Sequence, residues 1–162
     1  MIELRDVVVA YESRVILDSI NLTIDNGETL VILGGSGSGK STLLRLLIGL
    51  QRPTSGQIIV DGTDITTLSE DEFNTVRRKM GMVFQYSALF DSMSVGENVA
   101  FGLRQHTDLG DDEIKRIVAE RLDWVGLKGY ESYMPNELSG GMKKRVSLAR
   151  AIALDPSLIL YD

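Results

Sequence analysis

Apolar and polar residues alternate in the first part of the chain, whereas the middle part has the spacing of amphipathic helices. Residues 2–11 and 15–24 are rich in Val and Ile, and the apolar residues at the end of the second stretch have polar neighbours. This alternation is typical of a strand with one face in water. Asn26–Gly27 is a two-residue hairpin signal before residues 29–33. The pattern predicts an N-terminal antiparallel β layer. Tyr11 ends its first strand, and its residue type alone indicates simple packing at an edge.

The next stretch has the order of a strand, a glycine-rich turn and a helix. Residues 31–33 are apolar and predict a buried strand, and residues 43–50 predict a largely apolar helix. The turn between them fills the fixed positions of the phosphate-loop pattern G-x-x-x-x-G-K-[ST] with Gly34, Gly39, Lys40 and Ser41. The strand before the pattern and the helix after it are the context that this pattern requires.

This turn has the chemistry of a nucleotide-phosphate site. Glycines let successive backbone N–H groups surround a phosphate, and the helix start adds unpaired N–H groups and a positive dipole end. Lys40 is expected to bridge the terminal phosphates, and the Ser41 hydroxyl to ligate Mg²⁺. The alternative is a glycine-rich hairpin beside a core helix, which the match in context disfavours. The expected nucleotide-binding residues are Gly34, Gly35, Ser36, Gly37, Ser38, Gly39, Lys40, Ser41 and Thr42.

Further elements follow in the same α/β style. A turn at residues 52–56 precedes a predicted strand at residues 57–61. Ser69 to Glu72 form a capping box that opens a helix to about residue 80. Residues 81–84 predict another buried strand, with Gln85 at its end. A polar residue there usually just faces water, although an amide oxygen suits Mg²⁺.

Residues 86–138 predict a helical block between two strands. Ser94 to Glu97 form a second capping box, whose helix is expected to end near residue 105. Three carboxylates at residues 111–113 suit the start of a further amphipathic helix, which Gly126 ends. His106, the only histidine, has no partner in the pattern and is assigned a loop or surface role.

Ser139, Gly140 and Gly141 open a helix that is predicted to run to about residue 154. Serine is a fitting N-cap, and the glycines leave the first-turn N–H groups accessible, so this is a second helix start suited to an anion. Read alone, the same residues are an ordinary cap at least as often. Residues 157–162 are then an apolar strand that places the carboxylate of Asp162 at its tip, where it could hold Mg²⁺ through water.

Composition bounds the class of protein. The 162 residues suit one domain, and a content of 43% hydrophobic and 25% charged residues is ordinary for a soluble protein. No apolar run has the roughly 20 residues of a membrane span, and no signal peptide is recognised. The net charge of −6 argues against nonspecific binding of nucleic acid, which would need a basic surface. The absence of cysteine agrees with a cytosolic location.

Taken together, these motifs resemble the ATP-binding cassette (ABC) ATPase, the motor subunit of ABC transporters, over the whole chain. Gly34–Thr42 is similar to its Walker A motif, Gln85 to its Q-loop, Leu138–Met142 to its signature motif and Leu158–Asp162 to its Walker B motif. Tyr11 is similar to the aromatic residue that stacks on adenine, which reverses the edge-packing interpretation. Met142 departs from the usual signature, in which glutamine stands.

The resemblance implies an α/β fold of the P-loop NTPase (RecA-like) type with an N-terminal antiparallel β layer and an inserted helical subdomain. Residues 1–86 and 139–162 would form the β layer and the nucleotide-binding core, and residues 87–138 the helical subdomain. Lys40, Gln85, Ser139 and Asp162 are the implied catalytic residues. Ser41, Gln85 and Asp162 would hold Mg²⁺, and Tyr11, residues 34–42 and Ser139–Gly141 would bind ATP.

The resemblance also implies partners and a location. Two cassettes would face head to tail, so that Ser139 and the amides of Gly140 and Gly141 reach the γ-phosphate bound by the other copy. Closure would drive transmembrane permease subunits at the cytoplasmic face of the inner membrane. Residues 87–101 and 139–162 look like the cassettes of Mla-type transporters, which move phospholipid together with MCE-domain lipid-binding proteins.

The family pattern continues beyond Asp162. It places a glutamate that polarises water directly after the Walker B aspartate, and it inserts a later strand beside the Walker A strand. Because residues 1–162 contain neither, we expect an incomplete cassette that binds nucleotide weakly, does not turn over, and exposes unpaired backbone and apolar surface. Loss of a general base alone typically costs about 10²–10⁴-fold in rate.

Two alternatives stay open on the residues alone. A phosphate-loop kinase or GTPase would not explain Leu138–Gly141, and a GTPase should carry an N-K-x-D motif, which the sequence lacks. A nontransport ABC protein of DNA repair or translation would usually carry long coiled-coil insertions or a second cassette, and residues 86–138 have no long heptads.

Overall fold

The computed structural model describes residues 1–12 and 14–162, which form two compact units, residues 1–75 and 76–162. None of the described helices combines the length and the apolar character of a membrane span. The subdomain boundaries after residues 86 and 138 stay a prediction.

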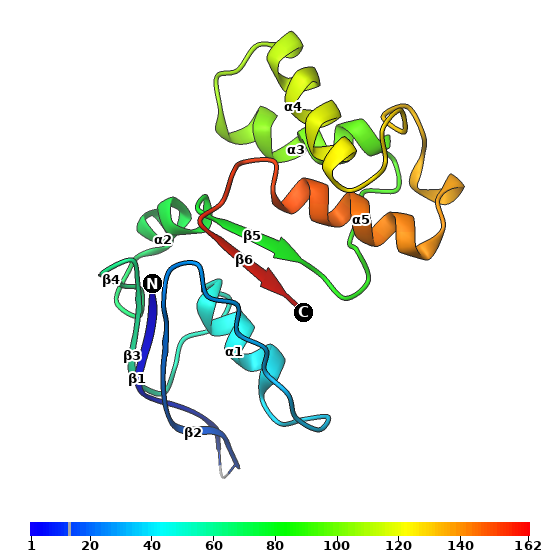
Figure 1. The fold of residues 1–162 in the computed structure, drawn as a ribbon. Coiled ribbons are helices and arrows are strands. Elements are labelled where there is room, and N and C mark those ends of the chain that lie inside the picture. The colour runs from blue at the N-terminus through cyan, green and yellow to red at the C-terminus, as the bar shows by residue number, and fades with distance from the viewer. Residues whose placement is uncertain (13) are drawn as a thin grey trace. The chain divides into compact units, whose positions relative to one another are not determined.

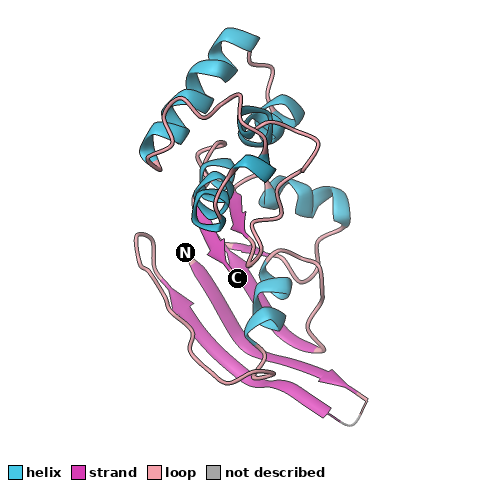
Figure 2. Cartoon of the chain, turned by 90° about the vertical axis from the view of Figure 1, so that its right-hand side faces the viewer, coloured by secondary structure: helices cyan, strands magenta, loops and turns pink. Residues whose placement is uncertain are grey.

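The first unit contains a four-stranded antiparallel sheet (Figure 2). Strand β1 (Ile2–Tyr11) pairs with both β2 (Arg14–Ile24) and β3 (Ser55–Val60), and β3 also pairs with β4 (Thr63–Asp64). The strand order is therefore β2-β1-β3-β4. The predicted β layer is thus confirmed. Of these strands, only β4 was not predicted.

One face of this sheet supplies much of the core of the first unit. Every second residue of β1 is buried on each side of an irregularity between Leu4 and Val7: Ile2 and Leu4 before it, and Val7 and Val9 after it. Helix α1 (Lys40–Leu47) buries its apolar side chains, and α2 (Glu70–Arg77) buries Phe73. Phe73 lies against Gly49, where an added Cβ would be 2.5 Å from the ring. Helix α2 begins at the predicted capping box, because Ser69 N–H donates to Glu72 at 2.8 Å.

The predicted buried strand before the phosphate loop is wrong. Residues 28–35 have no strand assignment, and Val31 and Leu33 are 70% and 88% exposed. The turn at Asn26–Gly27 does form, with Gly27 at a φ of 79°. A strand needs a partner to satisfy its N–H and C=O groups, and no described residue forms a ladder with residues 29–33. These residues match the expectation of unpaired backbone and exposed apolar side chains.

The second unit contains two parallel strands, β5 (Met80–Val83) and β6 (Leu158–Tyr161), which lie side by side (Figure 1). Both strands were predicted from their apolar runs. Gly81 lies close to helix α5 (Gly140–Ala151), since an added Cβ would be 2.5 Å from the carbonyl oxygen of Ala151.

The helices of the second unit pack around α5, which contacts β5, α3 and α4 (Figure 1). They are α3 (Val95–His106), α4 (Asp111–Trp124), the short 3₁₀ helix η1 (Pro135–Glu137) and α5 (Gly140–Ala151). Their shared core contains fully buried residues from each α-helix, such as Val99, Leu122 and Val146. Helix α5 ends before the predicted residue 154, and residues 152–154 form a turn.

The helix starts follow the predicted capping chemistry. Ser94 Oγ accepts from Glu97 N–H at 3.2 Å, while the Glu97 carboxylate accepts from Ser94 N–H at 2.7 Å. Ser139 Oγ accepts from Met142 N–H at 3.3 Å and caps α5. His106 is exposed at the last residue of α3, as assigned.

Ser147, in the middle of α5, predicts a stabilising substitution. Its side chain is fully buried, and its hydroxyl has no hydrogen-bond partner within the described residues. A buried hydroxyl without a partner costs about 1–3 kcal/mol, and alanine favours helices. We expect Ser147→Ala to raise the free energy of unfolding by about 1 kcal/mol in urea denaturation. Ser139→Ala, which removes the cap of the same helix, should lower it by about 1 kcal/mol. A loss of stability in Ser147→Ala would contradict this account.

The capping box of α3 predicts a pH dependence. The hydrogen bonds from Ser94 hold the pKa of Glu97 below its ordinary value of 4.5. A carboxylate with a lowered pKa in the folded state stabilises the fold above the unfolded pKa, and this contribution disappears as pH falls through the folded pKa. The stability advantage of the natural protein over Glu97→Gln should therefore be full at neutral pH and shrink below pH 4.5. Denaturant unfolding at several pH values measures it, and an advantage that grew toward acid pH would contradict it.

Candidate nucleotide-binding site

The phosphate loop adopts a conformation that depends on its glycines. Gly37 and Gly39 have φ values of 79° and 94°, in the left-handed region that favours glycine. At Gly34 an added Cβ would lie 2.6 Å from Ser38 Oγ, and at Gly39 it would lie 2.7 Å from the Leu17 side chain. The loop therefore curls tightly only because these positions lack side chains.

Lys40 lies across the mouth of its own loop. Its ammonium group donates to the carbonyl oxygens of Gly34 and Gly35, each at 2.8 Å, and to Ser38 Oγ at 3.4 Å. These three bonds use the three donors of the ammonium group. The positive charge is thereby held beside the backbone amides at which a phosphate would arrive.

The start of helix α1 is available to an anion. Its N-cap, Gly39, offers no side-chain hydrogen bond to the first turn, and no acidic residue stands in that turn. The first N–H groups of a helix have no partner within the helix, and the helix dipole is positive there. The loop and the helix start together form a phosphate cradle of the predicted kind.

A cavity of about 440 Å³ opens at this cradle, a volume in the range of small-molecule sites. Tyr11, at the end of β1, lines the same cavity and is half exposed. The structure thus brings the predicted aromatic residue and the predicted phosphate loop to one site. The other lining residues are Arg14, Ile16, Gly37, Ser38, Gly39, Lys40, Ser41, Thr42 and Arg45.

Two arginines of this cavity were missed by the sequence reasoning. Arg14 pairs with Tyr11 across the β1–β2 connection, and Arg45 follows Ser41 by one turn of α1. The i to i+4 spacing in a helix could have indicated Arg45. With Lys40 they give the cavity three cations, and no carboxylate lines it. The site is therefore cationic although the chain carries a net charge of −6.

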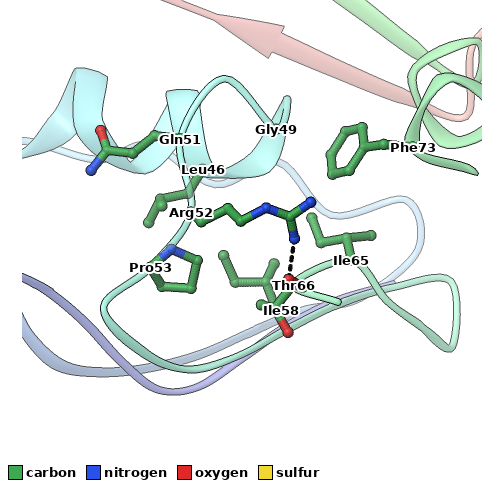
Figure 3. A pocket seen from close by; sticks show the side chains of 9 residues that line it. All are labelled: Leu46, Gly49, Gln51, Arg52, Pro53, Ile58, Ile65, Thr66 and Phe73. Atoms are coloured by element: carbon green, nitrogen blue, oxygen red, sulfur yellow. Dashed lines mark hydrogen bonds between the residues drawn. The ribbon is translucent and has the colours of Figure 1, made fainter. Parts of the chain in front are cut away.

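A second, smaller cavity in the first unit is not a ligand site. Figure 3 shows it between α1, β3 and the residues after β4, with the Arg52 side chain crossing it to the carbonyl oxygen of Thr66. Its volume of about 10 Å³ holds about one water molecule. Arg52 also donates to the carbonyl oxygen of Leu68. It thereby holds the segment between α1 and β3 against the segment between β4 and α2.

Gln85 and Asp162 follow neighbouring parallel strands of the second unit. Val83 pairs with Tyr161, and Asp162 N–H donates to the Val83 carbonyl at 3.0 Å. The amide side chain and the carboxylate therefore lie at the same edge of the β5–β6 sheet, and both residues are exposed. Among the described residues no group of three or more His, Cys, Asp or Glu side chains could hold a metal. Mg²⁺ prefers oxygen ligands and keeps several of its waters. The amide oxygen of Gln85 and the carboxylate of Asp162 therefore suit it without a cluster of three acidic residues.

Ser139, Gly140 and Gly141 are all exposed at the start of α5. An added Cβ at either glycine would meet nothing within 4 Å in this chain. The chain itself therefore leaves open space over the first turn of α5, as an approaching ligand or partner would require. Tyr11, Lys40 and Ser41 belong to the first unit, whereas Gln85, Asp162 and Ser139 belong to the second.

The motifs and the phosphate cradle coincide with a known family. The family model for the ABC transporter matches residues 17–162. The chain belongs to the ABC transporter family. The α/β cassette fold expected from the sequence is confirmed by a structure described as the dimeric post-hydrolysis state of an ATP-binding cassette bound to ADP and Pi. That structure superposes with a TM-score of 0.91 at 35% identity, over 100% of this chain and 73% of the other.

Curated relatives of this ABC family member carry transport names. The chain is 48% identical to the intermembrane phospholipid transport system ATP-binding protein MlaF of Haemophilus influenzae, over 100% of this chain and 61% of the relative. MlaF of Escherichia coli K12 is 46% identical over 100% and 60%. A probable ribonucleotide transport ATP-binding protein of Mycobacterium tuberculosis is 49% identical over 99% and 45%. The chain thus spans about three-fifths of the MlaF proteins that it matches.

Lys40 and Arg45 of the cavity are expected to contribute unequally to ATP binding. Lys40→Ala should weaken ATP binding by about 1.5–3 kcal/mol, because charge-assisted bonds to phosphate are lost. Arg45→Gln should cost less than about 1 kcal/mol, because Arg45 is exposed and screened by salt. Titration calorimetry at two salt concentrations measures both, with the exposed Arg104→Gln in α3 as control. Unchanged affinity in a folded Lys40→Ala variant would count against Lys40 as a ligand.

Proposed function

We propose that this chain provides the ATP-binding part of a transport-coupled ABC ATPase that moves phospholipid. The observation that carries the proposal is the cationic cavity, in which residues 37–42 of the phosphate cradle and Tyr11 line one space. A nucleotide has these two parts, a polyanion and an aromatic base. The cavity volume of about 440 Å³ is adequate for such a ligand.

Each part of the nucleotide finds matching chemistry. The exposed ring of Tyr11 offers a stacking surface for the base, while the amides of residues 37–41, Lys40 and Arg45 favour the phosphates. Phosphate oxygens would take over the ammonium donors that Lys40 now directs at Gly34 and Gly35. This exchange of equivalent bonds lets the loop bind without rebuilding itself.

Mg²⁺ would be held by the Ser41 hydroxyl, with Gln85 and Asp162 as further oxygen donors. When bound, it neutralises charge on the phosphate oxygens. The part of this chain is to place those oxygens: Ser41 at the cavity wall, and Gln85 and Asp162 at one sheet edge. ATP hydrolysis is proposed for the whole ATPase of which this chain provides the ATP-binding part.

The remaining site residues fit a second cassette. Ser139, Gly140 and Gly141 form an exposed, positively polarised helix start. Placed against the γ-phosphate of a second copy, this helix start would make closure of the dimer depend on ATP. The related cassette bound to ADP and Pi is described as dimeric. Closure would act on permease subunits at the cytoplasmic face of the inner membrane, with an MCE-domain protein as a further partner.

The transported molecule is proposed from the relatives. MlaF proteins are named for intermembrane phospholipid transport, and the mycobacterial relatives of similar identity are named for ribonucleotide transport. The resemblance of residues 87–101 to Mla-type cassettes favours phospholipid. ATP-dependent transfer of a labelled phospholipid between membranes by the assembled transporter would support this choice, and ATP-dependent ribonucleotide uptake would replace it.

Ser139→Arg tests the dimer geometry. A long cation at the start of α5 should block closure over the γ-phosphate of the other copy, while ATP binding by the monomer stays within about twofold. Sedimentation with and without ATP, in the protein as it assembles, measures closure. Ser132→Arg, at another exposed serine, is the matched control, and Ser139→Ala separates the loss of the cap from the clash. If Ser139→Arg reduced monomer binding and dimer formation equally, Ser139 would be misplaced in this proposal.

A further inference from the structure

The segment that carries Gln85 is built from two successive tight turns. Ser87 N–H donates to the Phe84 carbonyl at 2.9 Å, which places Gln85 and Tyr86 at the corner of a β-turn. Ala88 N–H then donates to the Tyr86 carbonyl at 2.7 Å, a γ-turn with Ser87 at its centre. Ser87 and Ala88 have φ values of 65° and 47°, which residues other than glycine rarely adopt. A γ-turn with positive φ is rare and strained.

Arg150, in the last turn of α5, holds both of these residues. Its guanidinium donates from Nη1 to the Ala88 carbonyl at 2.7 Å and from Nη2 to the Ser87 carbonyl at 3.0 Å. The same group lies 5.8 Å from the ring centroid of Phe90, within cation–π range. Arg150 is half-buried and burial lowers its pKa, yet no described carboxylate pairs with it. Its positive charge therefore interacts with the carbonyl oxygens of the strained turn.

Asn98 holds the other end of the segment. Its side chain is fully buried, accepts from Phe90 N–H at 2.8 Å and donates to the carbonyls of Phe90 and Met93, each at 3.1 Å. Phe90 also contacts Phe101 of α3, with ring centroids 4.7 Å apart. Residues 90–93 are thus fixed to α3, and residues 87–88 depend on Arg150 alone among the side chains of α5.

We propose that Arg150 is a positioning residue that ties the loop of Gln85 to the helix that begins at Ser139. Helix α5 runs about 16 Å from its N-cap Ser139 to Arg150. A stiff helix held at one end by Arg150 and presented to a second cassette at the other makes the two motifs move together. The functional part of this inference rests on the proposed function, in which Gln85 and Ser139 act on the same kind of ligand.

Arg150→Lys tests the inference, because lysine keeps the charge but cannot reproduce the planar fork toward two carbonyls. Arg145→Lys is a matched control on the same helix. Arg145 Nη1 also donates to two carbonyls, those of Val125 and Gly126 at 3.0 and 3.2 Å, but these end α4 and do not touch the Gln85 loop. Hydrogen exchange of the Ser87 and Ala88 amides reads the loop directly.

In Arg150→Lys these amides should exchange about tenfold faster or more, and in Arg145→Lys they should stay within about twofold of the natural protein. Ser87→Gly in the Arg150→Lys background should restore protection, because glycine adopts the positive φ without strain. Exchange that is unchanged in Arg150→Lys, or raised equally by both lysine variants, would overturn the inference. Should Arg150→Lys fail to fold, Ala88→Gly together with Arg150→Lys provides the same comparison.

The functional arm uses the protein assembled with its partner subunits. Arg150→Lys should lower kcat for ATP about tenfold with KM within about twofold, whereas Arg145→Lys should leave both near the natural values. A change confined to KM, or an equal loss of kcat in both variants, would overturn the coupling of the two motifs. If the natural protein neither binds nor hydrolyses ATP, the proposed function fails, and the exchange experiment still decides whether Arg150 holds the loop.

Discussion

The second unit depends on the close approach of helix α5 to strand β5. Gly81 allows this approach, since any side chain there would meet the carbonyl of Ala151. The same helix buries Val146 and Ala149 completely against the core that α3 and α4 share. Three arginines donate hydrogen bonds to backbone carbonyls around α5. Arg145 bonds to the end of α4, Arg150 bonds to the Gln85 loop, and Arg121 of α4 donates to the Ile152 carbonyl at 3.2 Å. One well-packed helix thus sets the positions of several functional segments.

The first unit solves a different problem, which is to keep backbone amides available. A loop of residues 34–39 that satisfied all its own N–H groups could not bind phosphate, and a loop with none satisfied would be costly. Lys40 satisfies two loop carbonyls, Ser38 N–H donates to the Gly35 carbonyl at 3.3 Å, and no N-cap side chain occupies the first-turn amides of α1. The result is a local cationic surface that the acidic composition of the chain as a whole conceals.

Local signals in the sequence were enough for most of the elements. The capping residues Ser69, Ser94 and Ser139 formed the expected hydrogen bonds, because each acts within one helical turn. The strand before the phosphate loop failed, since a strand is a property of two segments and residues 29–33 have no described partner. The role of Arg150 could not be recognised from the sequence, because its partners lie 62 and 63 residues earlier in the chain. Tyr11 needed the family resemblance, as its residue type says nothing about a cavity.

The exposed segment of residues 30–33 has a consequence for handling the protein. Leu30, Val31, Ile32 and Leu33 combine apolar side chains with backbone groups that no strand satisfies. Such a stretch, with high β propensity and no charge, is a template for strands of other chains and promotes aggregation. Aggregation should therefore increase with protein concentration more steeply than the net charge of −6 alone suggests, and pairing this segment with a neighbouring strand would suppress it.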